Sequence, residues 1–168
     1  MEQFDSLEKV KNYFRQATGE ENNDACYLVA LVDTSSDAAI IGGILGGAVG
    51  GAVGGAIGGM VAGMQQQYDG YLLMQTNDGF GLIPLIRDGI AWVNPYAKLQ
   101  VHPEKYFFVN NSDIKEFKIQ KVNMGTGRRI TIELNNKQKI RVVANKRDKH
   151  LPFLKECIEK ICERNNCK

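Results

Sequence analysis

The sequence predicts an α+β fold: an antiparallel β-sheet combined with a helix near each end of the chain. Two patterns predict it, namely short apolar runs separated by turn residues and apolar stripes at helical spacing. A third feature interrupts the fold near the N-terminus, because eleven of the 18 glycines lie between Ala38 and Met64, in a stretch without a charged residue. The fold class therefore includes a glycine-rich helix or helical hairpin inserted into the β-domain.

The first element is an amphipathic helix over residues 6–17, within an N-terminal unit of helix and loop at 1–25. Its apolar positions recur at steps of three and four: Phe4, Leu7, Val10 and Phe14. Asp5 and Glu8 resemble a capping pair. The apolar run Cys26–Val32 then predicts a first strand within residues 26–33.

Residues 67–168 have the pattern of a β-domain. The predicted strands are Gly70–Gln75, Phe80–Ile86, Ile90–Val93, Tyr106–Val109 and Ile114–Val122. Asp78-Gly79 between two apolar runs is a strong hairpin signal. A second hairpin spans Arg128–Ala144, where apolar and polar residues alternate on both sides of Asn135-Asn136. A C-terminal amphipathic helix follows at 151–165.

This order of elements resembles the bacterial pleckstrin-homology-like (PH-like) domains, in which a bent β-sheet or barrel is closed by a C-terminal helix. The residues that carry the resemblance are Tyr106–Gln120, the hairpin Arg128–Ala144 and the helix after His150. The strand Glu104–Phe108 is similar to one in uncharacterised bacterial proteins that join a glycine repeat to such a domain. The resemblance implies a fold and a tendency to bind, and no catalytic motif.

The glycine segment, at 38–66, contains five glycine pairs at a strict period of four. They are Gly42-Gly43, Gly46-Gly47, Gly50-Gly51, Gly54-Gly55 and Gly58-Gly59. On a helix this period lines one face with small residues, the glycine-zipper pattern of closely packed helices. In water such a helix is unfavourable by about 8–10 kcal/mol relative to alanine. The pattern therefore predicts a segment that enters or adheres to a membrane and associates with other copies.

Two membrane topologies follow from the flanks of this segment, which carry net charges of −5 before it and +7 after it. A single transmembrane helix would leave the acidic N-terminal part outside and the basic domain in the cytoplasm. If Cys26–Val32 pairs with strands after residue 68, both flanks lie on one side and the segment returns as a helical hairpin. The second topology is favoured, because a lone apolar strand needs a sheet to join.

The sequence contains no recognisable catalytic, metal or cofactor site. His102 and His150 are 48 residues apart and no ligand spacing surrounds either one. The period of four excludes a dinucleotide fingerprint, and the net charge of +2 argues against a nucleic-acid partner. The polar N-terminus predicts no signal peptide and hence reduced thiols. Cys157, Cys162 and Cys167, five residues apart, are expected to point in different directions from one helix.

One basic cluster is the candidate binding surface, for anionic lipid headgroups or a protein partner. It comprises Arg128, Arg129, Lys137, Lys139, Arg141, Lys146, Arg147 and Lys149. The alternative is a solvated face that protects a sheet edge.

These features together predict a non-enzymatic, membrane-associated interaction or scaffold protein, with the PH-like domain in the cytoplasm and the glycine zipper as the anchor and self-association element. Two alternatives remain: a pore-forming or toxin-like oligomer, and a soluble oligomer packed through the glycine helices.

Overall fold

A computed structural model describes residues 3–33, 68–90, 93–102 and 105–167. Its elements are α1 (Leu7–Thr18), β1 (Cys26–Val32), β2 (Gly70–Gln75), β3 (Gly79–Arg87), β4 (Leu99–Val101), β5 (Phe107–Asn110), β6 (Ile114–Val122), β7 (Gly127–Leu134), β8 (Lys139–Asn145) and α4 (Leu154–Arg164). The glycine segment lies outside the described residues.

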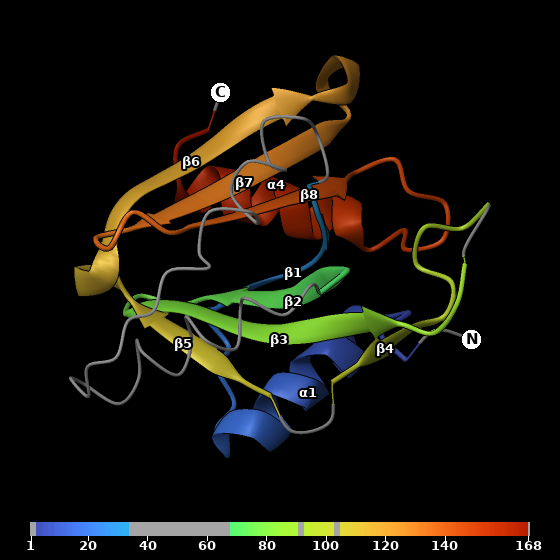
Figure 1. The fold of residues 1–168 in the computed structure, drawn as a ribbon, viewed down its shortest axis with the longest axis horizontal. Helices are drawn as coiled ribbons and strands as arrows, with labels where there is room; N and C mark the ends of the chain where they lie inside the picture. The colour runs from blue at the N-terminus through green and yellow to red at the C-terminus, as the bar shows by residue number, and fades with distance from the viewer. Residues whose placement is uncertain (1–2, 34–67, 91–92, 103–104, 168) are drawn as a thin grey trace.

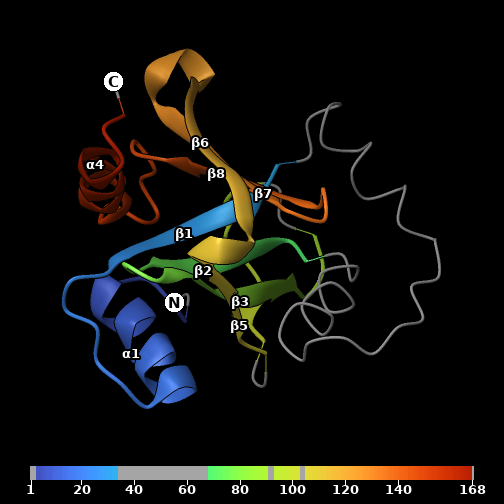
Figure 2. The same ribbon diagram turned by 90° about the vertical axis from the view of Figure 1, so that its left-hand side faces the viewer.

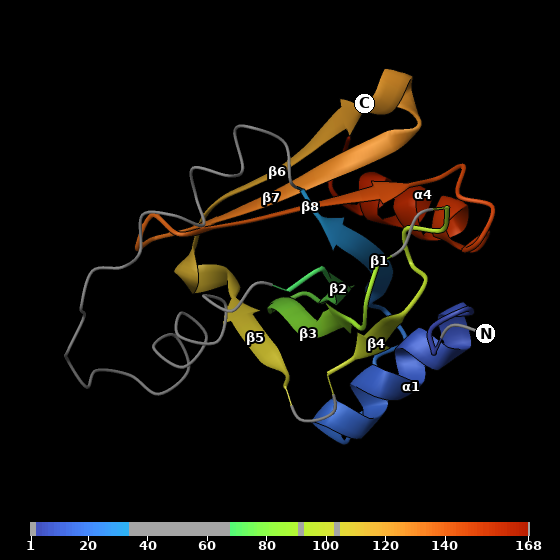
Figure 3. The same ribbon diagram turned by 45° about the vertical axis from the view of Figure 1, so that its right-hand side comes forward.

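The eight strands form one antiparallel sheet in the order β4-β3-β2-β1-β8-β7-β6 (Figure 1). β5 also pairs with β3, at the opposite end of that strand from β4, so β5 and β4 follow one another along the same edge (Figure 3). The sheet is open and not closed into a barrel, which corrects that part of the expected fold. The α+β class and the antiparallel sheet with a C-terminal helix are confirmed.

The open sheet is strongly bent. Phe80 on β3 and Phe117 on β6 have ring centroids 4.9 Å apart, although four other strands separate β3 from β6 in the sheet. Figure 1 shows the resulting two layers, with β6, β7 and β8 above β1, β2 and β3. The inner face of the bend therefore forms much of the core.

β1 is the centre of the molecule. It pairs with β2 over six residues and with β8 through Leu31 and Val32, and both helices pack against it. Figure 2 shows α4 and α1 at separate places along the sheet, α4 beside the upper layer and α1 below. A strand buried on both faces needs a continuous apolar sequence, which explains the run of letters CYLVALV.

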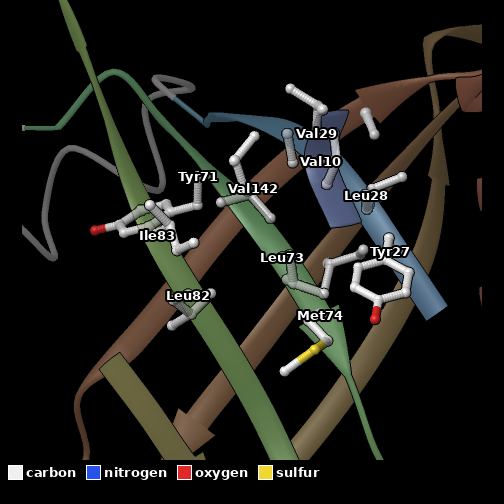
Figure 4. Packing of buried hydrophobic residues seen from close by; sticks show 14 of the residues in the cluster. Val10, Tyr27, Leu28, Val29, Tyr71, Leu73, Met74, Leu82, Ile83 and Val142 are labelled. Carbon is white, nitrogen blue, oxygen red and sulfur yellow. The ribbon is translucent and has the colours of Figure 1, made fainter. Parts of the chain in front are cut away.

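The core joins side chains from all of these elements. Figure 4 shows Leu28, Leu73 and Leu82 side by side on β1, β2 and β3, where they are cross-strand partners. All three are fully buried. Each such leucine stabilises the fold by about 1.5–3 kcal/mol relative to an exposed position.

The strand expected at Ile90–Val93 is not formed at its two described residues, and residues 91–92 lie outside the described part of the chain. Ile90 and Val93 are 66% and 82% exposed and belong to no strand. Gly89 has a φ of 88°, and the Asn94 side chain accepts a hydrogen bond from the Tyr96 amide, so the backbone departs from a strand at both of these places. The edge strand of this region is β4, which begins nine residues after Ile90.

The prediction of a transmembrane helix is also wrong for the described part of the chain. Its helices α1 and α4 have 12 and 11 residues, and neither is long and apolar enough to cross a membrane. The ten predicted glycine-zipper positions lie outside the described residues.

Candidate binding surface

The eight predicted basic residues do not form one surface. Residues alternate between the faces of β7, so Arg129 lies with Arg141 and Lys139 on one face and Arg128 on the opposite face. Lys137 is in the turn between β7 and β8. The remaining three follow β8 at the other end of this hairpin: Lys146, Arg147 and Lys149. The predicted basic residues therefore lie on both faces of β7 and at both ends of the β7–β8 hairpin.

Ion pairs within the molecule occupy much of the first face. The Arg129 Nε lies 2.5 Å from the carboxylate of Asp33, which is 8% exposed. Glu133 binds Lys139 at 2.9 Å and Lys115 at 2.7 Å. Hydrogen bonds from Lys115 and then Lys139 lower the pKa of Glu133 to about 2. The lysines on this face therefore help to hold the sheet, and their charge is largely compensated.

The β6–β7 turn at the other end of the hairpin has an unusual backbone. Asn123, Met124 and Gly125 have φ values of 51°, 55° and 86°, the left-handed region that non-glycine residues avoid. Met124 is fully exposed, at 103%. The turn therefore holds a large apolar side chain in water, and the left-handed backbone at Met124 is unfavourable by about 1–2 kcal/mol.

Basic residues flank this turn. The Arg128 Nη1 donates to the carbonyls of Gly125 and Gly127 at 2.8 and 2.9 Å, so its guanidinium folds against the turn. Lys121 is the cross-strand partner of Arg128. The amide of Lys146 donates to the Thr126 carbonyl at 3.0 Å, which places the residues after β8 beside the turn.

We name this set the basic turn surface: Lys121, Met124, Arg128, Lys146 and Arg147. The two stretches that form it, 121–129 and 145–149, contain six basic residues and one acidic residue. That acidic residue, Asp148, accepts hydrogen bonds from the amides of His150 and Leu151. Sequence reasoning included three of the five residues but missed Lys121 and Met124, which lie outside the cluster in the sequence.

The cysteines differ from expectation in one respect. All four are free, and Cys26 and Cys157 are buried. Burial, followed by the nearby Glu156, raises the pKa of the Cys157 thiol to about 12, which makes it unreactive at neutral pH. Cys162 and Cys167 were expected to diverge on one helix, but α4 ends at Arg164 and the chain then folds back.

The described residues hold no cluster of three or more His, Cys, Asp or Glu side chains that could bind a metal ion. His102 packs edge-on against Tyr68, with ring centroids 6.5 Å apart. His150 lies in the loop between β8 and α4.

The ends of the undescribed stretch 34–67 start from neighbouring strands. The Val32 amide donates to the Asp69 carbonyl at 2.9 Å, and Leu31 pairs with Gly70. Both flanks of the glycine segment therefore belong to one sheet. The pairing of Cys26–Val32 with a strand after residue 68, which is the condition for the helical-hairpin topology, is thus present, and the topology of the segment itself stays a prediction.

Comparison of the chain with protein-family profiles, with curated proteins and with solved structures finds no match in any of the three. The PH-like resemblance therefore stays a prediction from the order of elements.

Proposed function

We propose that the protein is a non-enzymatic, membrane-associated interaction protein whose basic turn surface binds anionic lipid headgroups. The observation that carries the proposal is Met124, fully exposed on a left-handed backbone in a turn that Lys121, Arg128 and Lys146 flank. An anionic membrane is negatively charged at its headgroups and apolar beneath them. An apolar side chain among basic residues suits such a surface.

The charge supports the same partner. Each Lys or Arg near an anionic membrane surface contributes about 1 kcal/mol to binding. Lys121, Lys146 and Arg147 have no ion pair with the other described residues, in contrast to Arg129 and Lys139 on the far face of the hairpin. The basic turn surface thus has charge available for an external anion.

The proposal also covers two features outside the basic turn surface: the fold of the β-domain and the glycine segment. The antiparallel sheet with a C-terminal helix supports a PH-like domain, a fold suited to binding at its loops. The period-four glycine pairs support self-association of the chain, a role that rests on their sequence pattern alone.

The test is sedimentation of the full chain with vesicles of phosphatidylcholine, alone or with about 30% phosphatidylserine. We expect binding only to the anionic vesicles. Neutralising two cations in Lys146→Gln with Arg147→Gln should weaken it by about 30-fold, the equivalent of about 2 kcal/mol.

The matched control removes the same charge elsewhere, in Lys137→Gln with Lys160→Gln, two exposed lysines in the β7–β8 turn and on α4. It should leave binding within about three-fold, because neither residue belongs to the basic turn surface. Equal losses in both double variants would overturn the proposal, and so would equal binding of the wild type to neutral and anionic vesicles.

A further inference from the structure

The C-terminal end of α4 is a Schellman motif. Asn166 has a φ of 52°, its amide donates to the Glu163 carbonyl at 3.2 Å, and the Cys167 amide donates to the Cys162 carbonyl at 2.9 Å. These two bonds are the 5→2 and 6→1 bonds of the motif, which reverses the chain after the last helical turn. The motif characteristically brings the side chains of its first and last residues together. Here both residues are cysteines.

The backbone of the two residues meets through the Cys167 amide and the Cys162 carbonyl, 2.9 Å apart, and the Cys167 thiol lies 4.0 Å from the Asn165 carbonyl oxygen. Both side chains are partly exposed, and both line one open groove together with Glu159, Glu163 and Asn166. A disulfide requires neighbouring α-carbons and side chains that face one another. The Schellman motif favours this arrangement, because a side-chain contact between its first and last residues frequently accompanies it. By contrast, Cys26 and Cys157 are enclosed in the core.

We propose that Cys162 and Cys167 are a redox-active pair that forms a reversible intramolecular disulfide across the C-terminal cap of α4. The oxidant is a low-molecular-weight disulfide. One cysteine thiolate attacks it, forms a mixed disulfide and releases one small thiol. The other cysteine then attacks the protein sulfur of that mixed disulfide and releases the second small thiol. The two electrons and the two protons of the protein thiols leave with the small thiols.

Burial and the neighbouring Cys162 thiol raise the pKa of Cys167 to about 11, so the Cys167 thiol is almost fully protonated at neutral pH. Disulfide exchange proceeds through the thiolate. The reaction should therefore accelerate as the pH rises from about 7 to 9, and the pair stays reduced unless an oxidant persists.

The bond would fix a contact between the helix and the sheet. The residues between the cysteines hold α4 to the strands: Arg164 donates to the Asp24 carbonyl and to Asn77, and Asn165 exchanges two amide hydrogen bonds with Gln75, at 2.8 and 2.9 Å. Closing the ring from Cys162 to Cys167 holds these two side chains in place. Oxidation thereby converts a hydrogen-bonded helix end into a covalent one.

The test is a peptide map of the native full chain after incubation with oxidised glutathione. Trypsin cleaves after Lys160 and Arg164, so the fragments 161–164 and 165–168 separate unless a disulfide joins them. We expect the joined fragment, lighter by two hydrogen atoms than the sum of its parts, as the main product, and its loss after reduction. The control variant Cys26→Ser should give the same joined fragment, and Cys167→Ser should give none.

Two results would overturn the inference. One is a product with glutathione on Cys162 and Cys167 and no joined fragment. The other is a map in which Cys162 is linked to Cys157 or to Cys162 of a second chain.

Discussion

Glu133 lies on the outer face of β7, where its side chain is only 10% exposed between two ammonium groups. Because hydrogen bonds from Lys115 and Lys139 stabilise the carboxylate, its pKa falls from 4.5 to about 2. A group with a lowered pKa in the folded state stabilises the protein above its unfolded pKa. That stabilisation decreases as the pH falls from 4.5 towards 2 and is absent below both values.

We therefore expect Glu133→Gln to flatten the pH dependence of the free energy of unfolding between pH 4.5 and about 2. Urea unfolding at a series of pH values measures it. The control is Glu116→Gln, which removes a carboxylate paired with Lys118 but 45% exposed. An equal effect of the two substitutions would contradict the role assigned to Glu133.

At the level of elements, Gly79 determines how β3 begins and how β5 reaches it. Gly79 pairs with Asn110, and a β-carbon added at Gly79 would lie 1.9 Å from the Val109 carbonyl oxygen. Backbone atoms cannot move aside as a flexible side chain can. The close approach of these two strands therefore requires a residue without a side chain.

Gly79→Ala should destabilise the fold by on the order of 3 kcal/mol, since β5 must separate from β3 or the turn must rearrange. Thermal and urea unfolding measure this loss. Gly19→Ala is the comparison, because Gly19 has a φ of 75° but nothing within 4 Å of an added β-carbon. We expect it to be unfavourable by only about 1 kcal/mol. If Gly79→Ala were the milder of the two, the β3–β5 contact would not be as described.

Sequence patterns predicted most strands well. The predicted bounds of β1, β2 and β6 agree with the structure, because continuous or alternating apolar residues identify such strands directly. β4 has only three residues, too few for a pattern, and it was missed. α1 was predicted, although its N-cap is Ser6, whose Oγ accepts from the Lys9 amide, in place of the expected Asp5.

The candidate sites were less predictable, for a physical reason. Met124 belongs to no apolar run or stripe in the sequence, and only its full exposure in the structure shows that it lies in water. The approach of Cys162 to Cys167 depends on where α4 ends, whereas a continuous helix would have separated them. Both sites depend on single turns, where one residue's conformation changes the direction of the chain.

At the scale of the whole molecule, the contact between the two layers of the bent sheet joins two residues that no local sequence pattern connects. Phe80 and Phe117 meet because the sheet bends over β2, β1, β8 and β7. Curvature accumulates from the twist between successive strands, so it depends on the entire order of strands. The central position of β1 has the same origin, since pairing joins strands on both sides of the glycine segment into one sheet.

This pairing predicts that the β-domain folds without the stretch 34–67. Val32 and Asp69 are hydrogen-bonded neighbours, so a turn of a few residues such as Asn-Gly can join β1 to β2 as a hairpin. Asp33 is kept, and with it the ion pair to Arg129. Shortening the connection should favour folding by about 2 kcal/mol, because a shorter loop loses less entropy on closure.

Circular dichroism and urea unfolding should show one cooperative transition at an equal or higher denaturant concentration. A shortened chain that unfolds without cooperativity would mean that the segment is required to assemble the sheet. Retention of anionic-vesicle binding by the shortened chain would assign that binding to the basic turn surface, and its loss would assign it to the glycine segment.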